Sequence, residues 1–208
     1  MIIALGYHCN VSFLNQSLRI KKETGAFEWL ECRKLQYITD VINTLTDNPE
    51  SNVIFGRDKR VHLLNPYFYS CHYNLNEYKT IFKRRYDRFI DNIKTTENLY
   101  FVRINPIFCK TTKNEIELFI KSIKKINPNI KFNFLLIETI INETEINSIS
   151  IDSDNVKFYH NYFYQRDVSD VYMKSPTIID DIYKKMLEDI GYNTNETNDI
   201  IFNDKCDI

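Results

Sequence analysis

The sequence predicts an α/β protein, with a mostly parallel central sheet and helices on both faces, on three observations. Residues 98–138 have the pattern strand, helix, strand. Apolar runs of strand length alternate with helical patterns along much of the remaining chain, which is typical of βαβ units. The 208 residues amount to little more than one domain of ~150 residues. We therefore expect a single α/β domain over 1–191, followed by a polar tail or edge extension over 192–208.

The first part of the chain predicts one strand and two helices. The strand covers residues 1–5 and ends at Gly6. Apolar residues at helical spacing predict helices over 11–22 and 35–48, and Pro49 closes the second. The inward faces of these two helices are Val11, Leu14 and Leu18, and Leu35, Ile38, Val41, Ile42 and Leu45.

Residues 50–78 fit no single pattern. Residues 53–55 and 61–64 have the length and composition of short strands, and Asn65-Pro66 is a turn signal. A helix is expected over 80–94, with its aromatic and aliphatic residues inward.

The clearest pattern begins at residue 98. Strands are expected over 99–104 and 132–137, with a helix over 113–126 between them, so that the two strands are parallel and joined by a right-handed crossover. A further strand over 156–159 and a last helix over 175–191, which opens on Ser-Pro, complete the prediction. In such folds sites gather at the carboxyl ends of the strands.

Composition and charge exclude several function classes. Lys+Arg 27 against Asp+Glu 28 leaves a formal net charge of -1, which argues against nucleic acid or an anionic membrane as a partner held by bulk charge. No apolar run approaches the ~18 residues of a membrane span. The N-terminus has neither a basic lead-in nor a cleavage site, so we expect a cytoplasmic protein.

The cysteines and the absent motifs limit the chemistry. Five cysteines without a CxxC pair indicate neither a disulfide framework nor a structural zinc site. There is no Walker A motif, no GxGxxG motif and no metal-ligand spacing, so we expect no metal and no cofactor.

Cys9 is the candidate nucleophile. It follows the first strand where a helix begins, and the partial positive charge of a helix N-terminus lowers the pKa of a thiol. The alternative is a small buried apolar residue, as most free cysteines are.

Four histidines are candidates for the base. His8 adjoins Cys9, and neighbouring side chains point apart. His62 lies in an apolar run and is expected to be a strand residue with a satisfied ring. His72, in a loop ahead of a helix, and His160, at a strand end, are near-equal candidates. Each could instead be a surface or capping histidine.

Arginine and lysine residues form two further features. Arg103 lies inside an apolar strand, where a charge is costly unless paired. It either meets a carboxylate or points from the strand end into the site as an anchor for an anion or a carbonyl. The cluster Lys83-Arg84-Arg85, together with Lys79 and Arg88, gives the helix over 80–94 a basic face, which is solvated, paired or able to bind phosphate.

Five motifs in order resemble one family. They are Leu5-Gly6-Tyr7-His8-Cys9, Phe27-Glu28-Trp29, Cys71-His72, the Arg-Arg helix Phe82–Phe89 and the strand Tyr100–Ile104. The series, which spans about residues 2 to 190, resembles a family described as papain-like cysteine peptidases, found in bacteria and large DNA viruses. The many Ile, Asn, Lys and Tyr residues indicate an AT-rich coding sequence, which also fits a large DNA virus. In that case we expect the protein in the host cytoplasm.

The resemblance implies a Cys–His hydrolase that acts on a peptide or other acyl substrate. Cys9 would be the nucleophile, His72 the base and Glu28 the group that orients it. Arg103, Trp29 and His8 are the expected substrate contacts. The chain has Glu28 where the family has aspartate, and Cys71 where the family has a histidine. These differences keep open a catalytically inactive interaction module that binds a host protein, anchored by exposed aromatics around 66–69. A transferase or carbohydrate-modifying role is a third possibility.

Overall fold

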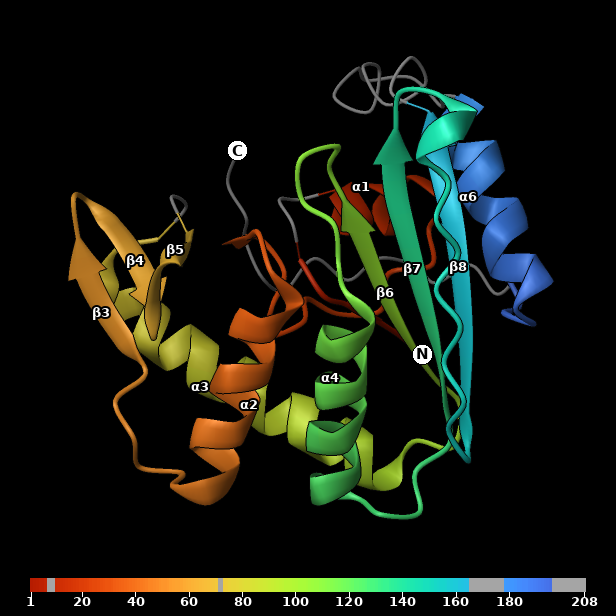
Figure 1. Ribbon diagram of the computed structural model, residues 1–208. Coiled ribbons are helices and arrows are strands. Elements are labelled where there is room, and N and C mark those ends of the chain that lie inside the picture. The colour runs from red at the N-terminus through yellow and green to blue at the C-terminus, as the bar shows by residue number, and fades with distance from the viewer. Residues whose placement is uncertain (7–9, 71–72, 165–177, 196–208) are drawn as a thin grey trace.

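The computed structural model describes residues 1–6, 10–70, 73–164 and 178–195 and has a mixed α/β fold, as the sequence predicts (Figure 1). A four-stranded parallel sheet has the order β1-β6-β7-β8. Its strands are β1 (Ile2–Ala4), β6 (Leu99–Asn105), β7 (Phe132–Ile140) and β8 (Val156–Tyr164).

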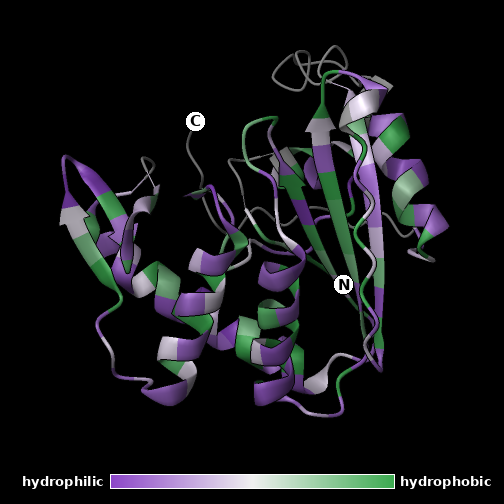
Figure 2. Cartoon of the chain, viewed as in Figure 1, coloured by the Kyte–Doolittle hydropathy of each residue, from purple (hydrophilic) through white to green (hydrophobic). Residues whose placement is uncertain are grey.

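The strand and helix predicted between 98 and 138 are confirmed. β6 and β7 are buried over nearly their whole length, and Figure 2 shows both strands as largely hydrophobic. The strand predicted over 156–159 is longer than expected and runs to Tyr164 as β8, paired with β7 along nine residues. His160 therefore lies inside a strand and not at its end, because pairing to β7 carries the extended backbone through a polar stretch.

Two apolar clusters meet alternate residues of the sheet. Leu99 and Phe101 of β6 pack in a large cluster with α2 (Leu35–Asp47), α3 (Leu75–Thr95) and α4 (Lys113–Ile126). Tyr100, Val102 and Ile104 pack in a second cluster with α1 (Asn10–Ser17) and α6 (Ile178–Asp189). α4 begins at a complete capping box between Thr112 and Glu115, which satisfies free N–H groups at its start.

The first helix is shorter than predicted. α1 ends at Ser17, and Arg19 has a positive φ of 56°. The N–H groups of Ile20 and Lys21 both donate to the carbonyl oxygen of Asn15, which reverses the chain and buries Lys21. Tertiary packing of this reversed segment therefore overrides the helical pattern that extended to residue 22.

Residues 31–70 form a second, antiparallel sheet with the order β2-β5-β4-β3. Its strands are β2 (Glu31–Cys32), β3 (Ile54–Arg57), β4 (Arg60–Leu63) and β5 (Asn65–Ser70). Figure 1 shows β3, β4 and β5 on the far side of α2 and α3 from the parallel sheet. Helix η1 (Glu143–Glu145) follows β7.

Two expectations about this region are wrong. Asn65-Pro66 is not a turn, since the reversal occurs at Leu64, whose φ is 52°, and β5 starts at Asn65. The aromatic cluster at 66–69 is not wholly exposed, because the alternation of a strand buries Phe68 completely and exposes Tyr67.

α3 begins five residues earlier than predicted and does not carry one continuous basic face. The side chain of Asn74 caps it by accepting the N–H of Glu77, a signal that the apolar pattern does not contain. Arg85 is buried, whereas Lys83 is exposed and pairs with Asp87 at 3.3 Å.

Candidate functional site

One face of the parallel sheet changes from apolar to polar near the carboxyl ends of its strands. The changes are from Phe101 to Arg103 on β6, from Leu136 to Glu138 on β7 and from Phe158 to His160 on β8. The register places Asn105, the last residue of β6, beside Glu138. Polar residues of three strands therefore share the edge at which parallel α/β sheets hold their sites.

Arg103 is fully buried and holds the end of β1. Its Nη1 donates to the carbonyl oxygens of Leu5 at 3.1 Å and Gly6 at 3.0 Å, and its Nη2 donates to that of Cys32 at 3.0 Å. Within the described ranges no ion pair to Arg103 is present. The guanidinium charge is therefore stabilised by backbone carbonyls that immediately precede the segment containing Cys9.

Gly6 fits against the second motif so closely that no side chain is tolerated. A Cβ atom at this position would lie 2.5 Å from the carbonyl oxygen of Phe27 and 3.1 Å from that of Leu30. The close approach of these backbones explains why a glycine follows the first strand. The first and second motifs are thus in direct contact.

Glu28 ties the second motif to α1. One carboxylate oxygen accepts the N–H of Gly25 at 2.9 Å, and the other accepts the Ser12 hydroxyl and pairs with the Lys21 ammonium at 2.7 Å. Glu28 and Lys21 are 4% and 7% exposed, so this is a buried ion pair. The carboxylate is therefore held by three donors, which belong to Ser12, Lys21 and Gly25.

Trp29 also packs against α1 and Lys21. Its φ of 62° is rare for a residue other than glycine, and its ring meets Phe13 edge to face at 5.3 Å. The Lys21 ammonium lies 5.3 Å from the ring centroid. The side chain is 6% exposed, so this predicted substrate contact is buried against α1.

β5 and α3 bring the third and fourth motifs toward the 27–32 segment. β5 pairs with β2 with Tyr69 opposite Glu31, so its last residue, Ser70, comes alongside Leu30. On the other side of the Cys71-His72 pair, Tyr73 accepts a hydrogen bond of 3.1 Å from Arg85 of α3. Ser70 and α3, whose Phe82, Tyr86 and Phe89 rings contact that of Phe27, therefore both meet the 27–32 segment.

Cys9, His8 and His72 lie outside the described residues. The structure fixes the residues that precede and follow these three positions, and the predictions for the three side chains remain predictions.

The two described histidines are both engaged by the fold. His62 lies in the strand β4, as predicted, with Nδ1 3.0 Å from the carbonyl oxygen of Pro66 and Nε2 3.2 Å from that of Arg57. In His160, Nδ1 accepts the N–H of Ile149 at 3.2 Å, and Nε2 faces Oε2 of Glu138 at 3.3 Å. His160 therefore contacts Ile149 and Glu138, and His72 stays the predicted base.

Glu138 links three segments at this edge. Its Oε1 accepts the N–H of Thr111 at 3.1 Å, and the Thr111 hydroxyl accepts from Nδ2 of Asn105 at 2.7 Å. Burial raises the pKa of Glu138, but the hydrogen bonds from His160 and Thr111 and the charges of His160 and Lys110 outweigh it, so the pKa is lowered overall.

Acid is expected to weaken the fold through Glu138. Because its folded pKa is lowered, the carboxylate contributes stability above the ordinary glutamate pKa, near 4.5, and loses it as the pH falls through the folded value. Urea unfolding of the wild type and Glu138→Gln between pH 7 and 3 should give a difference that shrinks toward acid. The exposed Glu117→Gln serves as the control. A difference independent of pH would contradict this role of Glu138.

The two described thiols are poor nucleophiles. Burial raises the pKa of Cys32 to about 11, although the nearby charge of Arg103 opposes this. Burial also raises the pKa of Cys109, partly offset by Arg33 and Arg103. Both thiols are therefore protonated at neutral pH, where a thiolate is the reactive form.

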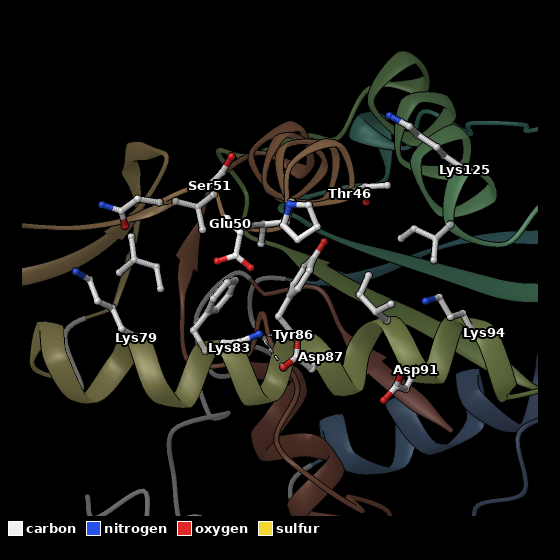
Figure 3. A pocket seen from close by; sticks show the side chains of 18 residues that line it. Thr46, Glu50, Ser51, Lys79, Lys83, Tyr86, Asp87, Asp91, Lys94 and Lys125 are labelled. Carbon is white, nitrogen blue, oxygen red and sulfur yellow. Dashed lines mark hydrogen bonds and ion pairs between the residues drawn. The ribbon is translucent and has the colours of Figure 1, made fainter.

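A groove of about 790 Å³ lies between the end of α2, the 49–54 segment and the outer side of α3 (Figure 3). Its apolar lining is Leu45, Val53, Ile54, Phe82, Tyr86, Ile90 and Ile126. Lysine and aspartate side chains of α3 stand along it, and Lys125 is near the end of α4. Because α4 starts at the carboxyl edge of the sheet and ends here, the groove lies at the opposite end from the site above. Its described lining contains neither histidine nor cysteine.

Comparisons with protein-family models, curated proteins and solved structures found no match. In the described part of the chain, no helix is long and apolar enough to cross a membrane. The same residues contain no group of three or more metal-ligating side chains.

Sequence reasoning missed Asn105, Thr111 and Glu138. A signal for two of them was present, since Asn105 and Glu138 are polar residues that end the two most apolar strands. Thr111 could not be found in this way, because it belongs to the loop before α4 and joins the network only through folding.

Proposed function

We propose that the chain is a thiol hydrolase that acts on peptide or other acyl substrates. In this proposal the sheet is mostly parallel with helices on both faces, and the Cys9 segment follows β1 at the carboxyl edge. One observation carries the proposal. Gly6, which precedes the Cys9 segment, and Ser70, which precedes the Cys71-His72 pair, are far apart in the sequence and lie against the same 27–32 segment.

The proposed reaction has two steps. The Cys9 sulfur attacks the acyl carbonyl carbon and forms a thioester, while His72 takes the thiol proton and passes it to the leaving group. Water then cleaves the thioester and restores the thiol. We assign Glu28 and Arg103 a structural role beside the Cys9 segment, because each already has three partners in the fold. The reaction needs no metal and no cofactor.

The proposed setting is a reducing cytoplasm, that of the host if the chain is viral. A catalytic thiol stays reduced there. The proposed partner is the acyl substrate or a host protein, and the near-zero net charge speaks against nucleic acid and membrane surfaces.

An interaction module on the same fold is the second candidate. Leu64 and Tyr67, at the start of β5, are 40% and 60% exposed, and exposed apolar and aromatic side chains can anchor a protein interface. This candidate requires no reactive thiol, so one measurement separates the two.

Alkylation of the folded protein by iodoacetamide at pH 7 is expected to label Cys9 selectively. The raised pKa values of Cys32 and Cys109 should keep these two thiols unlabelled. Peptide mass spectrometry locates the label, and His72→Ala should slow labelling of Cys9 about tenfold or more, in line with loss of a general base. Cys109→Ser is the control and should change nothing. Labelling of Cys9 no faster than that of a small free thiol would contradict the hydrolase and favour the interaction module.

A further inference from the structure

Two buried polar atoms on β6 lack hydrogen-bond partners in the described part of the chain. They are Nε of Arg103, a donor, and Oδ1 of Asn105, an acceptor. Both side chains are fully buried. Since buried polar groups in folded proteins are nearly always paired, each unpaired atom calls for an explanation.

The two atoms belong to one face of the sheet. Arg103 and Asn105 are two positions apart on β6, so their side chains leave the strand on the same side, about 7 Å apart along it. A donor and an acceptor on the same face of the sheet complement a group that carries both an acceptor and a donor. An amide is such a group, and each of its two hydrogen bonds would be about 2.9 Å long.

Hydrogen bonds on both sides fix the orientation of the two side chains. The other nitrogens of Arg103 are bonded to Leu5, Gly6 and Cys32. Asn105 is held through Nδ2 by Thr111, which in turn donates to Glu138. Arg103 cannot turn to satisfy Nε without breaking its three hydrogen bonds, and turning the Asn105 amide only exchanges which of its two polar atoms faces Thr111, so each side chain keeps one unpaired atom for an external group.

We propose that Arg103 and Asn105 bind an amide group, whose carbonyl oxygen accepts from Nε of Arg103 and whose N–H donates to Oδ1 of Asn105. The assignment rests on the proposed function, because it makes the acyl substrate an amide. It gives the site a preference for peptide-like groups over esters and carboxylates, which lack the N–H.

Binding can be measured without turnover in the Cys9→Ser protein. The probes are N-methylacetamide, N,N-dimethylacetamide, which has no N–H, and acetate, which has no N–H and carries a charge. Side-chain resonances of arginine Nε and asparagine Nδ2, followed by NMR during titration, report the site. We expect saturable shifts with N-methylacetamide and about tenfold weaker binding of the other two probes, the usual effect of one lost hydrogen bond to a buried group.

Asn105→Ala should remove the preference for N-methylacetamide over its dimethyl analogue. Asn133→Ala is the matched control, since Asn133 also has a buried Oδ1 without a partner but lies on β7 near the other end of the sheet. Equal binding of the two amides by the Cys9→Ser protein, or shifts that do not saturate, would overturn the proposal and assign a buried water to the two atoms. Tighter binding of acetate would make this an anion site instead.

The probe comparison needs no variant at the two positions, so misfolding of Asn105→Ala does not affect it. It is also independent of the thiol. Saturable amide binding with an unreactive Cys9 would refute the hydrolase alone, and a reactive Cys9 without amide binding would refute the amide site alone.

Discussion

Glu28→Ala is expected to lower the free energy of unfolding by about 3–5 kcal/mol, the usual cost of breaking a buried ion pair from one side. The substitution leaves the buried Lys21 ammonium without its carboxylate and removes the acceptor of the Gly25 N–H and the Ser12 hydroxyl. The uncompensated charge dominates this loss, because a buried ammonium without a counter-ion is more costly than an unpaired neutral donor. Urea denaturation followed by circular dichroism measures the change.

A double-mutant cycle tests the cause. Lys21→Met alone should also destabilise the protein, but Lys21→Met combined with Glu28→Ala should cost less than the sum of the two, because no buried charge is then left unpaired. Glu117→Ala breaks the exposed pair with Lys113 and should cost less than about 1 kcal/mol. If the two substitutions had additive effects on the free energy of unfolding, the ion pair between Lys21 and Glu28 would not stabilise the fold.

Arg103→Met should destabilise the fold by about 2–4 kcal/mol. Three hydrogen bonds from a charged donor contribute about 1.5–3 kcal/mol each, and the relief from removing a buried charge offsets part of that sum. The net loss of stability comes from the carbonyl oxygens of Leu5, Gly6 and Cys32, which the substitution leaves without their donors. Urea denaturation again gives the value.

The same variant has a second readout. Because Arg103 holds the carbonyl groups of Leu5 and Gly6, just before the segment that contains Cys9, the rate of Cys9 alkylation at pH 7 should fall in this variant. Arg103→Lys keeps the charge but not the planar fork that reaches three carbonyls, so its stability should lie between those of the wild type and Arg103→Met. Arg57→Met, at an exposed position, is the control and should change neither quantity. If Arg103→Met left the free energy of unfolding unchanged, these hydrogen bonds would not be needed to hold the end of β1 against Cys32.

The strand–helix–strand unit from 98 to 138 was predictable because its signals are local. Long apolar runs, a helical stripe and the break at Asn127-Pro128 all lie within one continuous segment. The region 50–70 was not predictable in the same way. Its strands are four to six residues long and exist through pairing with partners such as β2, so a local turn signal at Asn65-Pro66 was misleading.

The candidate site, too, was predictable only where its signals are local in the sequence. The sequence by itself determined the α/β class, the place of Cys9 just beyond the first strand and the unusual charge of Arg103 within an apolar strand, because periodicity and composition act over neighbouring residues. Only the tertiary structure decided that Arg103 holds β1 and β2, that Glu28 pairs with Lys21 and that His160 lies beside Glu138. These contacts join segments that are distant along the chain, and each depends on how buried polar groups find partners once the core has formed.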